Sequence, residues 1–224
     1  MIPRRNSSKA ASSVSQKKYL ERWLRLRQRD LATAGSVDAG EPFAPTEGAC
    51  AATAPITTIR HLVRPFDDTI VAGDIRLLTY REVATDHSLP RYIAVLQAWD
   101  EGLFLIAPYS KYHIPATTGE LATQRGHFSL ETLQLWNART IHELALKTTW
   151  RVDQMAPSER QDAMAAFRHV LTGEPLPKSL TGRIGAPILS PEDPRIAYQD
   201  EEAAVFCPLQ ARSMLIQELC QCLV

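Results

Sequence analysis

The chain has 224 residues, of which 45% are hydrophobic and 22% are charged, a balance that suits a packed core and argues against wholesale disorder. Its 25 basic and 25 acidic side chains cancel, which excludes a uniformly basic nucleic-acid binder. The charges are nevertheless segregated. Residues 1–32 hold nine basic and two acidic side chains, so the remaining residues hold 16 basic and 23 acidic ones. The sequence therefore predicts a basic N-terminal arm attached to an acidic body.

The N-terminal arm divides into three segments. Residues 1–15 are small, polar and basic, which predicts a disordered tail. Residues 16–32 are predicted to form a basic amphipathic helix, because Leu20, Trp23, Leu24 and Leu31 recur at helical spacing. Such a helix either docks on a membrane surface or a partner helix, or packs on its own domain. Residues 33–58 lack periodicity and are rich in Ala, Gly, Pro and Thr, which predicts a flexible linker.

Compartment is indicated by the cysteines and by the absence of long apolar runs. The four cysteines, at positions 50, 207, 220 and 222, lack the organised spacing of a disulfide framework, so we expect free thiols and a cytoplasmic protein. No run approaches the roughly 18 apolar residues of a membrane span, so no transmembrane segment is expected. The arginine- and serine-rich start is also compatible with an organelle transit peptide.

Residues 59–173 are predicted to form one domain that opens with strands. The β-branched run 69–80 predicts a strand with a bulge or turn at Gly73-Asp74. A polar loop, a second strand at 91–99 and a short turn follow, and the apolar run 103–107 is typical of a strand buried on both faces. After a long loop, the alternation at 132–136 predicts a further strand.

The C-terminal part of the chain is predicted to be helical at both ends. A helix begins at residues 156–159, carries an apolar stripe and ends at Gly173. Residues 174–224 are expected to form a proline-rich extended arm that leads into a C-terminal helix starting at Cys207 or Pro208. The acidic pair Glu201-Glu202, which lies in the arm, is expected to be solvated surface.

No established catalytic motif is present. The sequence has no glycine-rich phosphate loop, no nucleophile elbow and no metal-binding helix, and its six histidines show no ligand spacing. We therefore expect no metal site and no cofactor. Trp136 and Trp150 are expected in the core. Arg139 is interpreted either as a structural ion partner or as a catalyst, and the loop 110–123 either as substrate-flanking or as ordinary surface.

The order of the elements resembles that of the MazF/PemK-type toxin endoribonucleases. The matching pieces run over roughly residues 70–172 and are Gly73-Asp74-Ile75, Pro90 to Leu96, Phe104 to Ser110, Arg139-Thr140-Ile141 and Val152 to Leu171. The resemblance implies an α+β fold with a small, mostly antiparallel SH3-like β-barrel and flanking helices. It also implies a homodimer restrained by an inhibitory partner protein.

The same resemblance implies a catalytic site. Arg91 and Ser110 would be the catalytic residues of a metal-independent endoribonuclease that cleaves single-stranded RNA by attack of the RNA 2′-hydroxyl. An arginine suits this role because its charge and fork geometry match a phosphate. The substrate-binding residues would be Tyr92, Tyr109, Lys111 and Tyr112, since aromatic rings can stack on unpaired bases. The reaction would require Arg91 and Ser110 to face the same side of the sheet.

Two departures from the family keep a second hypothesis open. Arg91 follows its proline instead of preceding it, and neighbouring strand residues point to opposite faces. The acidic body also lacks the positive bias of a single-strand RNA groove. The alternative is a catalytically inactive barrel that acts as a protein-interaction or regulatory module, with the basic helix and the C-terminal helix as docking elements.

Overall fold

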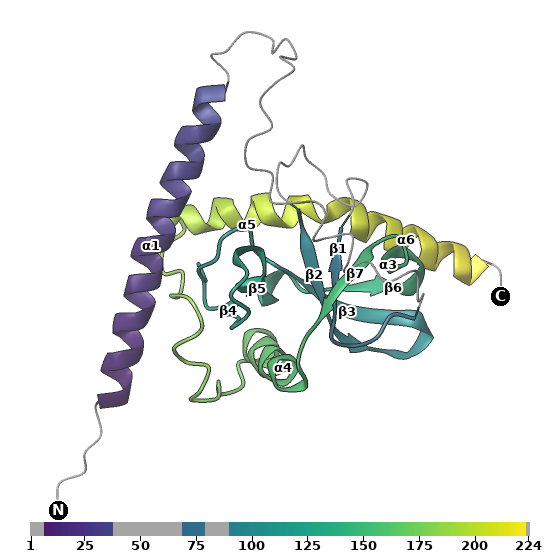
Figure 1. Ribbon diagram of the computed structural model, residues 1–224, viewed down its shortest axis with the longest axis horizontal. Helices are drawn as coiled ribbons and strands as arrows, with labels where there is room; N and C mark the ends of the chain where they lie inside the picture. The colour runs from purple at the N-terminus through teal and green to yellow at the C-terminus, as the bar shows by residue number, and fades with distance from the viewer. Residues whose placement is uncertain (1–6, 38–68, 79–89, 223–224) are drawn as a thin grey trace, which may run out of the picture.

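The computed structural model describes residues 7–37, 69–78 and 90–222 and has an α+β architecture (Figure 1). Its main sheet is antiparallel and has the strand order β6-β3-β2-β1-β7. The strands are β1 (Asp74–Leu77), β2 (Tyr92–Ala98), β3 (Leu103–Pro108), β6 (Arg139–His142) and β7 (Trp150–Gln154). A separate two-stranded sheet pairs β4 (Glu120–Ala122) with β5 (Thr132–Gln134). Within the described residues the main sheet is open, with β6 and β7 as its edges, so a closed barrel is not formed there.

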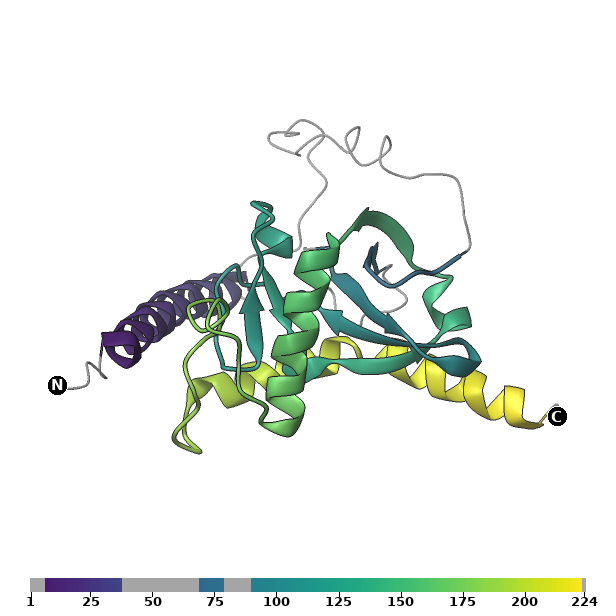
Figure 2. The same ribbon diagram turned by 90° about the horizontal axis from the view of Figure 1, so that it is seen from below.

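Helices cover both faces of the main sheet (Figures 1 and 2). Ala94 and Leu96 of β2 pack in a cluster with Ala163 and Ala166 of α4 (Pro157–Thr172). The alternate residues of the same strand pack on the opposite side, in a cluster that includes Leu209 of α6 (Cys207–Cys222) and residues of α3 (Glu143–Leu146). Because side chains alternate along a strand, an apolar run is required when both faces are buried. The expectation of a strand buried on both faces at 103–107 is confirmed.

The turn before β1 depends on a glycine. Gly73 has a φ of 103°, a conformation that residues with a Cβ rarely adopt. In this conformation its N–H donates to the carbonyl of Val95, and its own carbonyl accepts from the N–H of Met155. The predicted bulge or turn at Gly73-Asp74 thus ties β1 to the strands on either side. The strand itself is shorter than predicted, and residues 79–80 of the expected 69–80 strand lie outside the described residues.

The N-terminal helix is longer than the sequence indicates. Helix α1 (Ser7–Val37) includes the predicted 16–32 helix, but it also takes in part of the expected tail 1–15 and the first residues of the expected linker 33–58. Residues 38–58 of that linker and Cys50 lie outside the described residues. Of the two alternatives for this helix, packing on its own domain is observed, because Trp23 is fully buried against the body.

The proline-rich arm is not extended throughout, which corrects the prediction for this segment. It contains helix α5 (Pro194–Val205), which begins with Asp193 as its N-cap and with proline at its first position. Proline is well tolerated there because the first helical N–H groups have no partner within the helix. Helix α6 follows directly, so the predicted C-terminal helix is present. In both views α1 and the end of α6 lie at opposite ends of the molecule (Figures 1 and 2).

Candidate functional site

Arg91 lies immediately before β2, and its side chain is held by α5. Its Nη1 and Nη2 atoms are 3.1 and 3.2 Å from the two carboxylate oxygens of Glu202. Both residues are buried, Arg91 with 5% and Glu202 with 1% of its surface exposed. Two parallel N–H···O bonds are the strongest geometry available to an arginine and a carboxylate. The positive charge of Arg91 is therefore neutralised inside the protein.

Ser110 follows β3 and is also buried. Its hydroxyl lies 2.7 Å from the Tyr198 hydroxyl and accepts a hydrogen bond from the backbone N–H of Tyr112 at 2.9 Å. Tyr198 belongs to α5, as Glu202 does, and the two are one helical turn apart. Helix α5 therefore supplies hydrogen-bond partners for both residues that the resemblance predicts to be catalytic.

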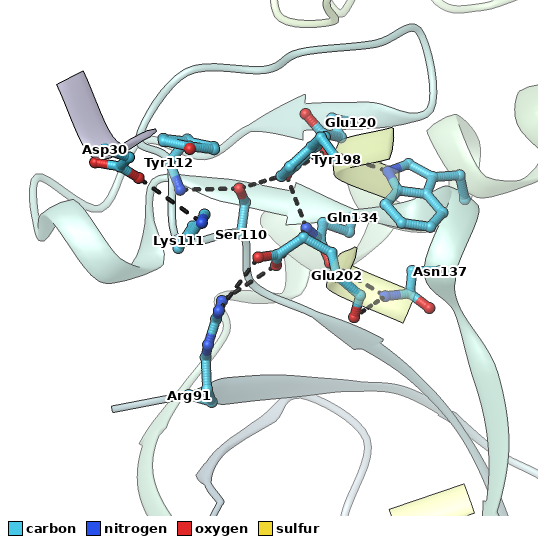
Figure 3. A network of polar contacts seen from close by, with 11 residues as sticks. Asp30, Arg91, Ser110, Lys111, Tyr112, Glu120, Gln134, Asn137, Tyr198 and Glu202 are labelled. Carbon is cyan, nitrogen blue, oxygen red and sulfur yellow. Dashed lines mark hydrogen bonds and ion pairs between the residues drawn. The ribbon is translucent and has the colours of Figure 1, made fainter. Parts of the chain in front are cut away.

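Gln134, at the end of β5, joins the two halves of this arrangement (Figure 3). Its Nε2 atom donates to the Tyr198 hydroxyl and to Glu202 Oε2, both at 2.9 Å. A continuous chain of polar contacts therefore leads from Arg91 through Glu202, Gln134 and Tyr198 to Ser110 (Figure 3). We call these five residues the polar network. The structure brings Arg91 and Ser110 into this one network, although neither side chain faces solvent.

Glu120 extends the polar network into the protein interior. Its carboxylate accepts hydrogen bonds from the Tyr198 hydroxyl at 2.9 Å, from Trp136 Nε1 at 3.1 Å and from the backbone N–H of Ala116. Burial raises the pKa of Glu120 to about 7; the three hydrogen bonds oppose this rise, and the nearby Glu202 carboxylate adds to it. The approach of Trp136 needs Gly119, since a Cβ there would lie 2.8 Å from the Trp136 Cβ.

Helix α1 covers the polar network from the side of Tyr198. The indole of Trp23 lies 5.2 Å from the Tyr198 ring and 5.7 Å from the Tyr112 ring, in edge-to-face arrangements. Burial raises the pKa of both tyrosines, that of Tyr198 well above its ordinary value. Two ion pairs, Arg27–Glu201 and Asp30–Lys111, flank the three rings. The helix therefore seals the network from solvent on this side.

The residues that were predicted to bind substrate are not arranged as a free stacking surface. Tyr109 is 1% exposed within the core, and Tyr112 is 4% exposed beneath α1. Tyr92 is half-buried against the cluster on the α4 side of the sheet. Lys111 pairs with Asp30 at 3.7 Å and lies 5.1 Å from the centre of the Tyr112 ring. In this arrangement Tyr109 and Tyr112 have no face available for a base, because their own chain already packs on them.

Arg139, interpreted either as a structural ion partner or as a catalyst, has a structural role through hydrogen bonds, and the partners that the structure shows for it are uncharged. Its guanidinium donates to Asn137 Oδ1 and to the carbonyl of Ala203, both at 2.9 Å. It thereby joins β6 to the end of α5. The expected core position of Trp150 is wrong, because Trp150 is 44% exposed on the edge strand β7. Trp136 is partly buried and donates to Glu120.

Four residues of this site were missed from the sequence: Glu120, Gln134, Tyr198 and Glu202. A signal for two of them exists, since the buried side chains of α5 are spaced by three, four and three residues, namely Arg195, Tyr198, Glu202 and Val205. This spacing is that of a helical stripe. Three of its four members are polar, so the stripe does not stand out as an apolar periodicity. Arg195 starts the stripe and donates to the carbonyls of Ala116, Ala186 and Pro187.

Because comparisons with known proteins found no match, any conclusion about function must come from the fold and the site. No family model, curated protein or solved structure matches the chain. Among the described residues, no group of three or more His, Cys, Asp or Glu side chains is placed to hold a metal ion. No helix in the described ranges combines the length and the apolar character needed to cross a bilayer.

Proposed function

We propose that the protein is a catalytically inactive binding module whose sheet serves as a scaffold for α1 and α5. The observation that carries this proposal is the pairing of the buried Arg91 guanidinium with Glu202 at 3.1 and 3.2 Å. A catalytic arginine must bind a phosphate, whereas Arg91 already binds a carboxylate of its own chain. The Ser110 hydroxyl is likewise engaged by Tyr198.

The free energy needed to separate Arg91 from Glu202 supports a permanently closed site. A phosphate could reach Arg91 only if Glu202 withdrew, which would leave a carboxylate without its partner. Removing one member of a buried ion pair costs about 3–5 kcal/mol. Displacement of α5 would also expose Tyr198 and Val205, which are 0% and 4% exposed. The substrate would therefore have to compete with a large part of the stability of the fold, which is about 5–15 kcal/mol for a domain.

The SH3-like barrel is part of this proposal. The β1–β7 pairing shifts register between Ile75 and Arg76, and the β2–β3 pairing does so between Val95 and Gln97. Register irregularities of this kind bend strands and increase their twist, which curls a sheet in the direction of closure. The free thiols of Cys207 and Cys220 are exposed, which favours a reducing compartment such as the cytoplasm for the module.

A second candidate is the metal-independent endoribonuclease of the MazF/PemK type. It is favoured by one observation, the presence of Arg91 and Ser110 in the same polar network. In this candidate, Glu202 occupies the position that an RNA phosphate would take, since carboxylate and phosphate bind the arginine fork in the same way. Single-stranded RNA as substrate, a homodimer and an inhibitory partner protein belong to this candidate.

One experiment separates the two candidates. The wild-type chain and the Arg91→Ala, Glu202→Gln and Glu201→Gln variants are incubated with mixed-sequence single-stranded RNA in EDTA. Glu201→Gln is the matched control, because it changes the neighbouring, half-exposed carboxylate that faces Arg27. Circular dichroism establishes that each variant is folded.

The binding module predicts intact RNA with all four proteins. Cleavage by the wild type that disappears in Arg91→Ala would establish the nuclease. Cleavage by Glu202→Gln, but by neither the wild type nor Glu201→Gln, would establish a nuclease that its own helix α5 closes. Both cleavage results overturn the binding module.

A further inference from the structure

The outer side of α1 carries a row of cations that the fold does not use. Lys18, Arg22 and Arg25 are spaced by four and three residues and are all exposed. At about 100° per residue, their side chains fall in one narrow sector of the helix, roughly 150° from the direction of Trp23 and Arg27. We call these three residues the basic stripe. The basic stripe faces away from the body, because Trp23 and Arg27, on the other side of the helix, are buried against the body.

Within the described residues Lys18, Arg22 and Arg25 form no ion pair, although the exposed Glu21, three residues after Lys18 and four before Arg25, places one negative charge at the edge of the stripe. The ion pairs that dock α1 use other residues, Arg27 with Glu201 and Asp30 with Lys111. Arg29 lies one turn beyond Arg25 and is exposed, but it has an interaction of its own and is not counted in the stripe. Three adjacent like charges on a helix destabilise it slightly, so their placement contributes nothing to docking.

The charge distribution of the whole chain points to an anionic partner for this surface. Residues 1–32 hold nine basic and two acidic side chains, whereas the rest of the chain holds 16 basic and 23 acidic ones. An acidic body repels a polyanion, and a basic helix at one end of the molecule, as Figure 1 places α1, keeps the contact away from that body. Among the described elements, α1 is therefore the one best placed to approach a polyanion closely.

We propose that the basic stripe binds the phosphate backbone of double-stranded DNA, without sequence preference. A helix presents charges spaced by three and four residues in a regular row, which can face phosphates that are presented in regular rows along a duplex. Single strands are bound largely through stacking on aromatic side chains, whereas Trp23 of α1 is buried and Tyr19 packs on the same cluster and donates to the Gly182 carbonyl. Anchoring in a membrane surface needs a continuous exposed apolar face, whereas Trp23, Leu24 and Leu26 of α1 pack on its own domain.

Duplex DNA is favoured over duplex RNA by groove shape. The major groove of B-form DNA is wide enough, at about 12 Å, to admit one side of a helix of about 10–12 Å diameter. The major groove of an A-form RNA helix is deep and narrow, and side chains do not enter it. This inference deepens the proposed function by naming the partner class of the binding module.

The test is fluorescence anisotropy of a labelled mixed-sequence DNA duplex with the full chain at several salt concentrations. Three phosphate contacts predict a slope of about −2.7 in the plot of log affinity against log salt. Raising salt from about 50 to about 200 mM should then weaken binding roughly 40-fold. The triple variant Lys18→Gln/Arg22→Gln/Arg25→Gln should lose at least about tenfold in affinity at the lower salt and most of the slope.

The matched control removes the same charge elsewhere. Arg168→Gln/Lys178→Gln/Arg212→Gln changes three exposed cations that lie outside α1, and we expect duplex affinity within about twofold of the wild type. The inference is overturned if the two triple variants weaken binding equally, or if the wild type does not bind the duplex. Tighter binding to duplex RNA, to single-stranded RNA or to anionic lipid vesicles than to duplex DNA would overturn it as well.

Failure of this inference is distinguishable from failure of the proposed function. If RNA stays intact in EDTA and the DNA duplex is not bound, the binding module stands with a different partner. If RNA is cleaved, the binding module fails whatever the duplex measurement gives.

Discussion

Arg91 and Glu202 lie 111 residues apart in the sequence, yet the two nitrogens of one meet the two oxygens of the other at 3.1 and 3.2 Å. Gln134 donates to the same carboxylate at 2.9 Å, and Asn137 donates to the Glu202 backbone carbonyl at 3.5 Å. The pair therefore fixes the position of α5 against the start of β2 and the end of β5. It also removes from solvent the charge that a nuclease of this type would need.

The first prediction concerns the ion pair itself. Glu202→Leu should lower the free energy of unfolding by about 3–5 kcal/mol, because it leaves the buried Arg91 charge without a partner. The double variant Arg91→Met/Glu202→Leu should be more stable than Glu202→Leu, since it removes both charges together. Urea unfolding followed by circular dichroism measures both.

The control for this cycle is Glu201→Gln. Glu201 has about half of its side chain exposed, so its pairing with Arg27 should contribute no more than about 1 kcal/mol. If the double variant is as unstable as Glu202→Leu, the lost stability comes from the packing of α5, and the unpaired Arg91 charge is not its cause.

The second prediction concerns the pH dependence of stability. An ordinary glutamate has a pKa of 4.5, and burial raises the pKa of Glu120 to about 7. Between these values the folded protein keeps a proton that the unfolded chain has released, so the free energy of unfolding falls as the pH rises. The contribution of Glu120 is fully present below about pH 4.5 and is lost as the pH passes about 7, with an upper limit of about 3 kcal/mol.

The measurement is urea unfolding of the wild type and of Glu120→Gln between about pH 4.5 and pH 8. The variant should be less stable at low pH, because its amide group must face either the Ala116 N–H or the Trp136 Nε1–H, which are both donors. Its stability should nevertheless lack the Glu120 part of the pH dependence. An identical fall with pH in both proteins would contradict this assignment.

The third prediction concerns the docking of α1. Trp23→Ala removes the indole that packs on Tyr112 and Tyr198, a change that typically costs about 3–5 kcal/mol. Because α1 reaches the body mainly through this side chain and its neighbours, the loss should appear as local detachment of the helix. Amide hydrogen exchange of residues 17–32 should accelerate at least about a hundredfold, since each 1.4 kcal/mol corresponds to about tenfold.

Leu31→Ala is the matched control within α1. Leu31 is 55% exposed, so its truncation should change stability by less than about 0.5 kcal/mol and leave exchange of the helix unchanged. Equal acceleration in the two variants would mean that Trp23 has no particular role in holding α1.

The sequence predicts well those parts of the fold that depend on local pattern. The buried run at β3, the second strand at β2 and the helix ended by Gly173 all follow from apolar periodicity and from helix-stop chemistry. Helix α5 is not predicted in this way, because the high proline content of its segment favours extended chain. Its proline stands at the first helical position, where the missing N–H breaks no hydrogen bond within the helix.

The candidate site was predictable only in part, and for a physical reason. Arg91 and Ser110 stand out because of their places beside strands. Their partners Glu202 and Tyr198 come from a helix about 90 or more residues further along the chain. Nothing in the local sequence of Glu201-Glu202 shows that one carboxylate is solvated and the next one buried. That difference arises when α5 packs on the sheet, which is a property of the tertiary structure.

The aromatic cluster under α1 has a consequence for how the protein is made. Trp23 precedes Tyr198 by 175 residues in the sequence, so it leaves the ribosome well before its aromatic partner is made. Until α5 emerges, the nascent chain carries an exposed indole and an arginine before β2 that has no carboxylate to meet. Contacts between such distant segments form slowly because of the loop that they must close. Helix α5 must therefore be synthesised before the protein can bury the inner face of α1, and a chain that is cut short before α5 should be bound by chaperones as incompletely folded.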